Sequence, residues 1–90
     1  MQTIKNTTKR GQRFIRAYEN SGCFDLWDCY GRFSSAKARA EDCCREQMEK
    51  ENGMGFKIIS FNTCTFTAAW LVPGGLRVET AQNSFFVATE

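Results

Sequence analysis

The sequence contains no histidine among its 90 residues. Histidine is the side chain whose pKa lies nearest neutrality, and it is the usual base that activates a serine or cysteine nucleophile. Without it, the common hydrolase triads are excluded. We therefore expect a protein that is not an enzyme and that needs no cofactor.

Long hydrophobic runs are absent as well. A helix needs roughly 20 apolar residues to cross a bilayer, and no segment of this chain approaches that length. Residues 1–16 also lack the apolar stretch of a secretory signal. We expect a cytoplasmic protein that makes no contact with a membrane.

Paired CxxC motifs, which are typical of structural zinc sites, are missing too. The five cysteines are odd in number and lack the spacing of a disulfide framework, which is typical of a reducing compartment. Cys43 and Cys44 are adjacent and would diverge by about 100° on a helix, so they are poorly placed to chelate one ion. We expect no metal site and interpret the cysteines as small buried hydrophobic residues, with a redox switch or a cysteine nucleophile as the alternative.

The chain does contain enough apolar residues, 42%, to fold as one small domain over residues 1–90. Residues 1–11 are polar and partly basic, which predicts an extended basic arm. Residues 12–32 alternate apolar and polar positions on either side of turn-forming residues at 20–22. This pattern predicts a strand hairpin.

A single long helix is predicted over residues 34–52. Ser34 or Ser35 can accept hydrogen bonds from the free amides that open it, and Asn52 with Gly53 supplies the stop. One side of this segment carries small and apolar residues at helical spacing, which indicates the face that packs on the sheet. These residues are Ala36, Ala40, Cys43, Cys44 and Met48.

Residues 55–89 return to strand patterns separated by turn residues, and short connections make neighbouring strands antiparallel. We expect an α+β fold with a single antiparallel sheet of five or six strands, in ββαβββ order, and one long helix packed on one face. Several strands carry apolar groups on both faces, and one helix covers only one of them. The far face is therefore expected to be either an interface or a partly buried surface.

Positive charge is concentrated at the start of the chain. Residues 1–16 contain five basic residues and no acidic one, whereas residues 17–90 contain seven basic and ten acidic residues, so the net charge of +2 is the sum of +5 and −3. A cationic segment on an acidic body is suited to binding phosphate or an acidic protein face, and a solubilising tail without a partner is the alternative. We expect the partner or nucleic-acid contact to involve Lys9, Arg10, Arg13, Arg16 and Arg32.

The chain resembles the small phage-encoded anti-CRISPR proteins, most of all those directed against type I-F surveillance complexes. The resemblance covers most of the chain and lies in its size, the predicted hairpin, the helix opening SSAKARAE at residues 34–41 and the meander of residues 53–90. This family has no shared signature, so no functional residue is transferred. The resemblance implies an inhibitor, acting in the cytoplasm of the bacterial host, that binds the CRISPR-Cas effector and prevents it from hybridising with target DNA. There the acidic body would meet lysine-rich protein and the basic segment would meet guide-RNA phosphate.

Two alternatives stay open. Strands followed by a helix after Gly31, Arg32 and Phe33 also resemble the sheet-reading N-terminal domains of phage integrases, which implies a small DNA-binding module. The acidic body counts against this alternative, because a protein that binds free duplex is more often basic throughout. The other alternative is a structural phage protein that self-associates, for example as a homodimer, through an apolar sheet face.

Overall fold

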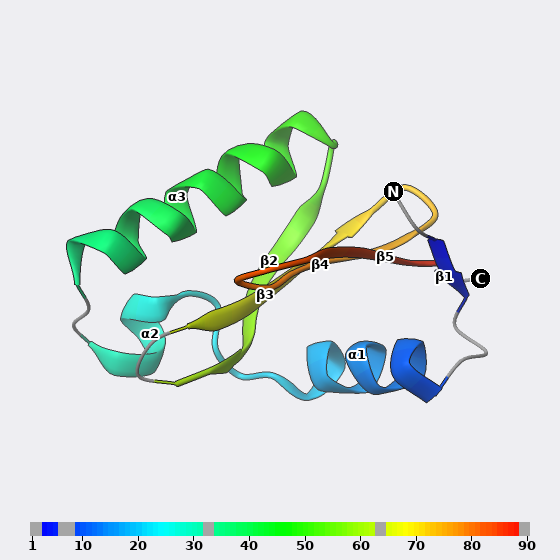
Figure 1. Cartoon of the computed structure of the whole chain (residues 1–90), viewed down its shortest axis with the longest axis horizontal. Helices are drawn as coiled ribbons and strands as arrows, with labels where there is room; N and C mark the ends of the chain where they lie inside the picture. Colours follow the sequence, from blue (N-terminus) through cyan, green and yellow to red (C-terminus); the bar gives the residue numbers. More distant parts are fainter. Residues whose placement is uncertain (1–2, 6–8, 32–33, 63–64, 89–90) are drawn as a thin grey trace.

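The computed structural model describes residues 3–5, 9–31, 34–62 and 65–88. A five-stranded sheet in the order β1-β5-β4-β3-β2 lies between α1 on one side and α2 with α3 on the other (Figure 1). Strands β2 to β5 form an antiparallel meander, and β1 joins β5 in parallel. The elements are β1 (Thr3–Lys5), α1 (Lys9–Asn20), α2 (Leu26–Tyr30), α3 (Ser35–Lys50), β2 (Met54–Phe61), β3 (Phe66–Val72), β4 (Gly75–Glu79) and β5 (Ser84–Ala88).

The α+β class and the antiparallel meander are confirmed, and α3 lies within the helix predicted at residues 34–52. The ββαβββ order is wrong. Residues 12–32 contain α2 and most of α1 where a strand hairpin was expected, and the antiparallel part of the sheet has four strands. The extended arm at residues 1–11 is also corrected, because Lys9–Asn20 is helical and Thr3–Lys5 is a strand; residues 1, 2 and 6–8 lie outside the described part.

Helix α1 forms because its apolar residues recur at helical spacing. Gly11, Phe14, Ile15 and Tyr18 are three, four and seven positions apart, which places them on one face of a helix, and all four are buried or half-buried. The ring of Phe14 stacks on Phe85 of β5 with 5.7 Å between centroids. The hydroxyl of Tyr18 donates a 2.6 Å hydrogen bond to the carbonyl of Gly55. Two adjacent apolar residues, Phe14 and Ile15, do not fit the two-residue period of a strand. The prediction of a strand hairpin in this segment was wrong for that reason.

We expected the second face of the sheet to lack a covering helix, but α1 packs against that face. The core is accordingly split between the two faces of the sheet. On the α1 side, Tyr18 packs with Ala69, Leu76, Val78 and Val87. On the side of α2 and α3, the buried residues are Leu26, Phe56, Ile58, Ala68 and Trp70.

The segment that joins α1 to α2 covers the open edge of β2. The amide of Ile58 donates to the carbonyl of Cys23 (3.2 Å), and the hydroxyl of Ser21 donates to the carbonyl of Ile58 (2.9 Å). Backbone N–H and C=O groups that are unpaired at the edge of a sheet can form hydrogen bonds with a strand of another chain. At Ile58 both backbone groups are already occupied, so this part of the edge is closed to strand addition.

Helix α3 is held at two places by carboxylates. Glu41 lies in its middle, is 7% exposed, and accepts hydrogen bonds from the amide of Leu26 (3.0 Å) and from Arg45 Nε (3.2 Å). Glu51, at the C-cap, accepts hydrogen bonds from Trp70 Nε1 (3.1 Å) and Arg77 Nε (3.2 Å) on the sheet. These two contacts join α3 to α2 at one place and to β3 and β4 at the other.

Candidate functional site

The outer face of α1 carries the basic residues that were predicted to bind a partner. Because the apolar residues of α1 point toward the sheet, the residues between them, Lys9, Gln12, Arg13 and Arg16, point outward and are exposed. They recur at three, four and seven positions and so form one stripe, about 10 Å long at 1.5 Å rise per residue. Together they line a shallow groove of about 210 Å³. We call this stripe the α1 cationic face.

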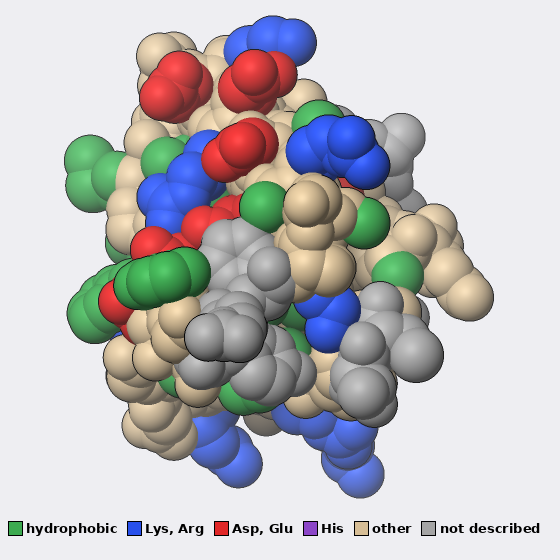
Figure 2. All heavy atoms as spheres, turned by 90° about the vertical axis from the view of Figure 1, so that its left-hand side faces the viewer, with side chains coloured by type: hydrophobic (Ala, Val, Ile, Leu, Met, Phe, Trp, Pro, Cys, Tyr) green, Lys and Arg blue, Asp and Glu red, His purple; other side chains and the backbone are tan. Residues whose placement is uncertain are grey.

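Nothing in the described protein neutralises these charges. The ion pairs of the described residues join Arg45 to Asp25 and Glu41, and Arg77 to Glu51; none involves the α1 cationic face. Helix α1 carries no acidic residue in its first turn, where positive charge opposes the helix dipole at a small cost in stability. In Figure 2, basic side chains project from the lower edge, where α1 lies in Figure 1, while acidic and basic side chains lie together near the top, over α3.

Three of the five predicted contact residues are brought together on this face: Lys9, Arg13 and Arg16. Arg10 belongs to α1, but its side chain is not among those the structure describes, and Arg32 lies outside the described residues. The prediction missed Gln12. A helical period applied to residues 9–16 would have found it, because that period places position 12 between positions 9 and 16.

The chemistry of this face suits binding. Guanidinium groups donate paired hydrogen bonds to phosphate, an ammonium group supplies a point charge, and the amide of Gln12 adds both a donor and an acceptor. The four residues that line the groove are three cations and one amide. The arrangement is therefore able to hold a phosphate-rich strand.

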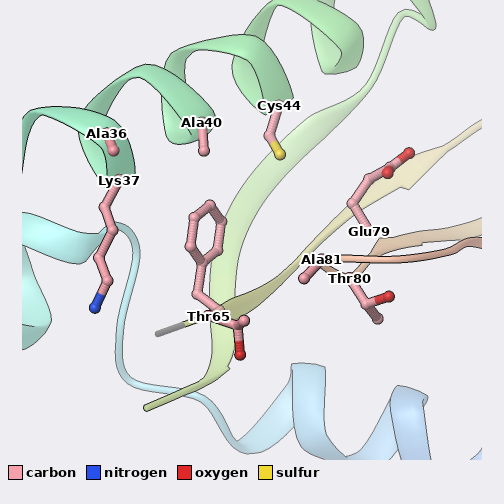
Figure 3. A pocket seen from close by; sticks show the side chains of 9 residues that line it. Ala36, Lys37, Ala40, Cys44, Thr65, Glu79, Thr80 and Ala81 are labelled. Atoms are coloured by element: carbon pink, nitrogen blue, oxygen red, sulfur yellow. The ribbon is translucent and has the colours of Figure 1, made fainter. Parts of the chain in front are cut away.

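A second hollow of about 360 Å³ lies between the first half of α3 and the sheet (Figure 3). Ala36, Ala40 and Cys44 point from the helix toward it, and Glu79 rises from the end of β4 on the opposite wall. The helix face that was predicted to pack closely is thus only partly covered, because Ala36 and Ala40 remain exposed. We call this hollow the α3 groove.

Two of the described cysteines, Cys29 and Cys44, have raised pKa values. Burial, with smaller contributions from Glu79 and other neighbours, raises the pKa of Cys44 to about 11. Burial, followed by the hydrogen bond and charge of Cys23, raises the pKa of Cys29 to about 12. A thiol with such a pKa is neutral near pH 7 and a poor nucleophile. The described cysteines, Cys23, Cys29, Cys43 and Cys44, are free, and no group of three metal-ligating side chains occurs within the described ranges.

Two large aromatic side chains are also exposed near α2. Phe24 is 55% and Trp27 61% exposed, and the ammonium group of Lys57 lies 6.0 Å from the ring centroid of Phe24.

None of the described helices is both long and apolar enough to cross a membrane. No protein-family model, no curated protein and no solved structure matches this chain.

Proposed function

We propose that this protein is a small, non-enzymatic binding protein that docks through the α1 cationic face onto a phosphate-rich surface of a ribonucleoprotein. The observation that carries the proposal is the gathering of Lys9, Arg13 and Arg16 on one exposed helix face without an ion pair in the described protein. Retaining unpaired cations on one stripe, against the helix dipole, favours use by an anionic partner.

The resemblance to anti-CRISPR proteins gives the proposal its specific form. We propose that the ribonucleoprotein is a type I-F CRISPR-Cas surveillance complex in the cytoplasm of a bacterial host, and that the bound protein prevents the complex from hybridising with target DNA. Of the features on which this resemblance was based, the helix opening at residues 34–41 and the meander are present, whereas the segment expected to be a hairpin is helical. The phosphate contacted by α1 would be that of the guide RNA.

The test measures binding of the purified protein to an isolated type I-F surveillance complex. The double variant Arg13→Ala, Arg16→Ala removes two charged donors, each contributing roughly 1.5–3 kcal/mol, so we expect affinity to fall at least about tenfold. Arg39→Ala, Lys50→Ala is the matched control, because it removes two exposed cations from α3. Circular dichroism and thermal unfolding establish that each variant is folded.

An unchanged affinity in the folded Arg13, Arg16 variant would overturn the assignment of this face. Loss of binding in the control variant as well would show that affinity follows net charge alone. Failure of the wild-type protein to bind the surveillance complex, together with binding to naked RNA, would remove the CRISPR-Cas target and keep the phosphate-binding face.

The two alternatives have lost the features on which they depended. The integrase-like hypothesis required strands before the long helix, and residues 9–20 and 26–30 are helical there. Self-association was inferred from a second apolar sheet face, which α1 covers. Salt-sensitive binding of naked duplex by the wild-type protein would restore the first alternative, and a dimeric mass in solution would restore the second.

A further inference from the structure

The α3 groove combines an apolar wall with one carboxylate, that of Glu79, and one ammonium group, that of Lys37. Ala36 and Ala40 supply methyl groups from the helix, and Phe66 of β3 and Ala81 add apolar surface from the sheet side. Glu79 is the only acidic residue that lines the groove within the described part of the chain. A volume of about 360 Å³ is large enough for a side chain or a small ligand.

The two charged side chains that line the groove, Lys37 and Glu79, differ in the contacts that they make. The carboxylate of Glu79 accepts a 2.8 Å hydrogen bond from the hydroxyl of Ser84, and no ion pair joins it to a cation of the described protein. The ammonium group of Lys37 donates a 3.2 Å hydrogen bond to the carbonyl of Asn62 and keeps its charge, but it lies at the other end of the groove from Glu79 (Figure 3). Cys44, on the wall near Glu79, is an uncharged thiol. The groove therefore presents a carboxylate without a counter-ion at the end of an apolar channel.

We propose that the α3 groove binds an arginine side chain of a partner protein. The aliphatic stem of arginine is suited to lie along the methyl groups of Ala36 and Ala40, as long cationic side chains do on apolar surfaces. Its guanidinium group donates two parallel hydrogen bonds to a carboxylate and stacks on aromatic rings, which matches Glu79 and Phe66. At the Glu79 end of the groove, charge complementarity thus favours a cationic side chain over an anionic or purely apolar occupant.

This inference deepens the proposed function, on which it rests for the identity of the partner. Proteins that hold RNA are rich in cationic side chains beside the phosphates. A protein that contacts RNA phosphate through α1 and an arginine through the α3 groove holds a ribonucleoprotein at two places of opposite charge. The two surfaces lie on opposite sides of the sheet (Figure 1), so they contact different parts of the partner.

The test uses N-acetyl-L-arginine amide as the probe, titrated into the full chain and followed by amide NMR shifts. We expect saturable shifts at residues 36–44 and 79–81 and none in α1. Glu79→Gln keeps an oxygen for Ser84 but removes the charge, so we expect at least about tenfold weaker binding. Ala40→Leu fills the channel without changing charge and should also abolish binding. Glu46→Gln, an exposed acid on the same helix, is the matched control and should change nothing.

Equal binding of the probe by Glu79→Gln and wild type would overturn the inference. So would amide NMR shifts that occur around Glu46 and not at the groove residues. So would equal binding of the uncharged analogue N-acetyl-L-citrulline amide, since the argument requires a cation. The Arg13→Ala, Arg16→Ala variant separates the two proposals, because it should bind the surveillance complex more weakly than wild type and bind the arginine probe as well as wild type does. If the wild type fails to bind any ribonucleoprotein yet binds the probe through Glu79, the proposed function fails and the arginine site stands.

Discussion

At the scale of single residues, the buried charges serve the fold. Arg77 is 6% exposed, and its Nε donates to Glu51, while its guanidinium group lies 5.8 Å from the ring centroid of Phe86. Glu41 accepts from Leu26 and Arg45, and Arg45 also bonds Asp25 at 3.3 Å. Each of these groups has its partners inside the protein, which distinguishes them from the outward cations of α1.

Replacing Glu41 by Ala should strongly destabilise the protein. The change leaves the amide of Leu26, whose side chain is fully buried, without its acceptor and removes one of the two acidic partners of Arg45. We expect the free energy of unfolding to fall by about 2–3 kcal/mol, measured by urea denaturation. Glu46→Gln on the same helix should stay within about 0.5 kcal/mol of wild type. Equal effects of the two changes would contradict a structural role for Glu41.

Glu51 should make stability depend on acid pH. Burial raises its pKa, but hydrogen bonds from Gln47, Trp70 and Arg77, with the charge of Arg77, outweigh burial and hold it below the ordinary 4.5. A pKa lowered in the folded state contributes stability that is fully present above the unfolded pKa and is lost as pH falls through the folded pKa. We therefore expect Glu51→Gln to be less stable than wild type at pH 7.

The measurement is the unfolding free energy of wild type and Glu51→Gln between pH 7 and pH 3. The difference between the two proteins should shrink as pH falls below about 4.5. Glu49→Gln, two residues away and exposed, serves as the control and should follow the wild-type profile. A difference that stays constant down to pH 3 would show that Glu51 does not titrate with folding.

At the scale of elements, the helices differ in how well the sequence specifies them. Helix α3 has a serine cap, sixteen residues and a stop at Asn52, which adopts a positive φ of 58°. Helix α1 packs its apolar face against the sheet. Short helices are marginal without tertiary contacts. The long helix was therefore predictable, whereas α1 was mistaken for a strand.

The cap of α3 distinguishes two serines that the sequence left equivalent. The hydroxyl of Ser34 accepts from the amide of Lys37 at 3.3 Å, whereas Ser35 is the first residue of the helix. We expect Ser34→Ala to lower the free energy of unfolding by about 1 kcal/mol and Ser35→Ala to have little effect. Thermal or urea unfolding of the two variants decides the matter. A larger loss from Ser35→Ala would place the cap one residue later.

At the scale of the whole molecule, the excess of positive charge lies on one side of the sheet. Helix α1 holds four basic residues and one acidic one, Glu19. On the other side, the exposed acids of α3, Asp42, Glu46 and Glu49, are mixed with the exposed cations Arg39 and Lys50. This arrangement lets a protein with a net charge of only +2 present a strongly cationic surface to a partner.

The salt dependence of RNA binding should report how many cations take part. If Lys9, Arg13 and Arg16 each neutralise one phosphate, log K against log salt should fall with a slope of roughly −2 for single-stranded RNA and roughly −3 for a duplex. The Arg13→Ala, Arg16→Ala variant should reduce the slope to about −0.7 on single-stranded RNA. Fluorescence anisotropy with labelled oligonucleotides measures it. A slope unchanged by the double variant would mean that other cations bind the phosphates.

The sequence by itself determined the α+β class, the long helix, the antiparallel meander that follows it and the clustering of positive charge. Each of these depends on local signals: caps, turn residues, strand propensity and residue type. The candidate contact residues Lys9, Arg13 and Arg16 were found in the same way, from their charge alone. Their grouping on a helix with Gln12 was not. The spacing of residues 9–16 is compatible with a helix, but a short segment adopts the conformation that buries its apolar side chains, and the surface available to bury them is set by the rest of the chain.

Only the tertiary structure decided that α1 covers the second sheet face, that the α1–α2 connection closes the edge of β2 at Ile58, and that a groove remains under Ala36 and Ala40. The groove depends on how far α3 stands from the end of β4, which is a relation between residues about forty positions apart. Neither periodicity nor composition encodes such a distance. It follows from packing the whole chain around one sheet, where the small side chains of α3 leave space that Glu79 borders.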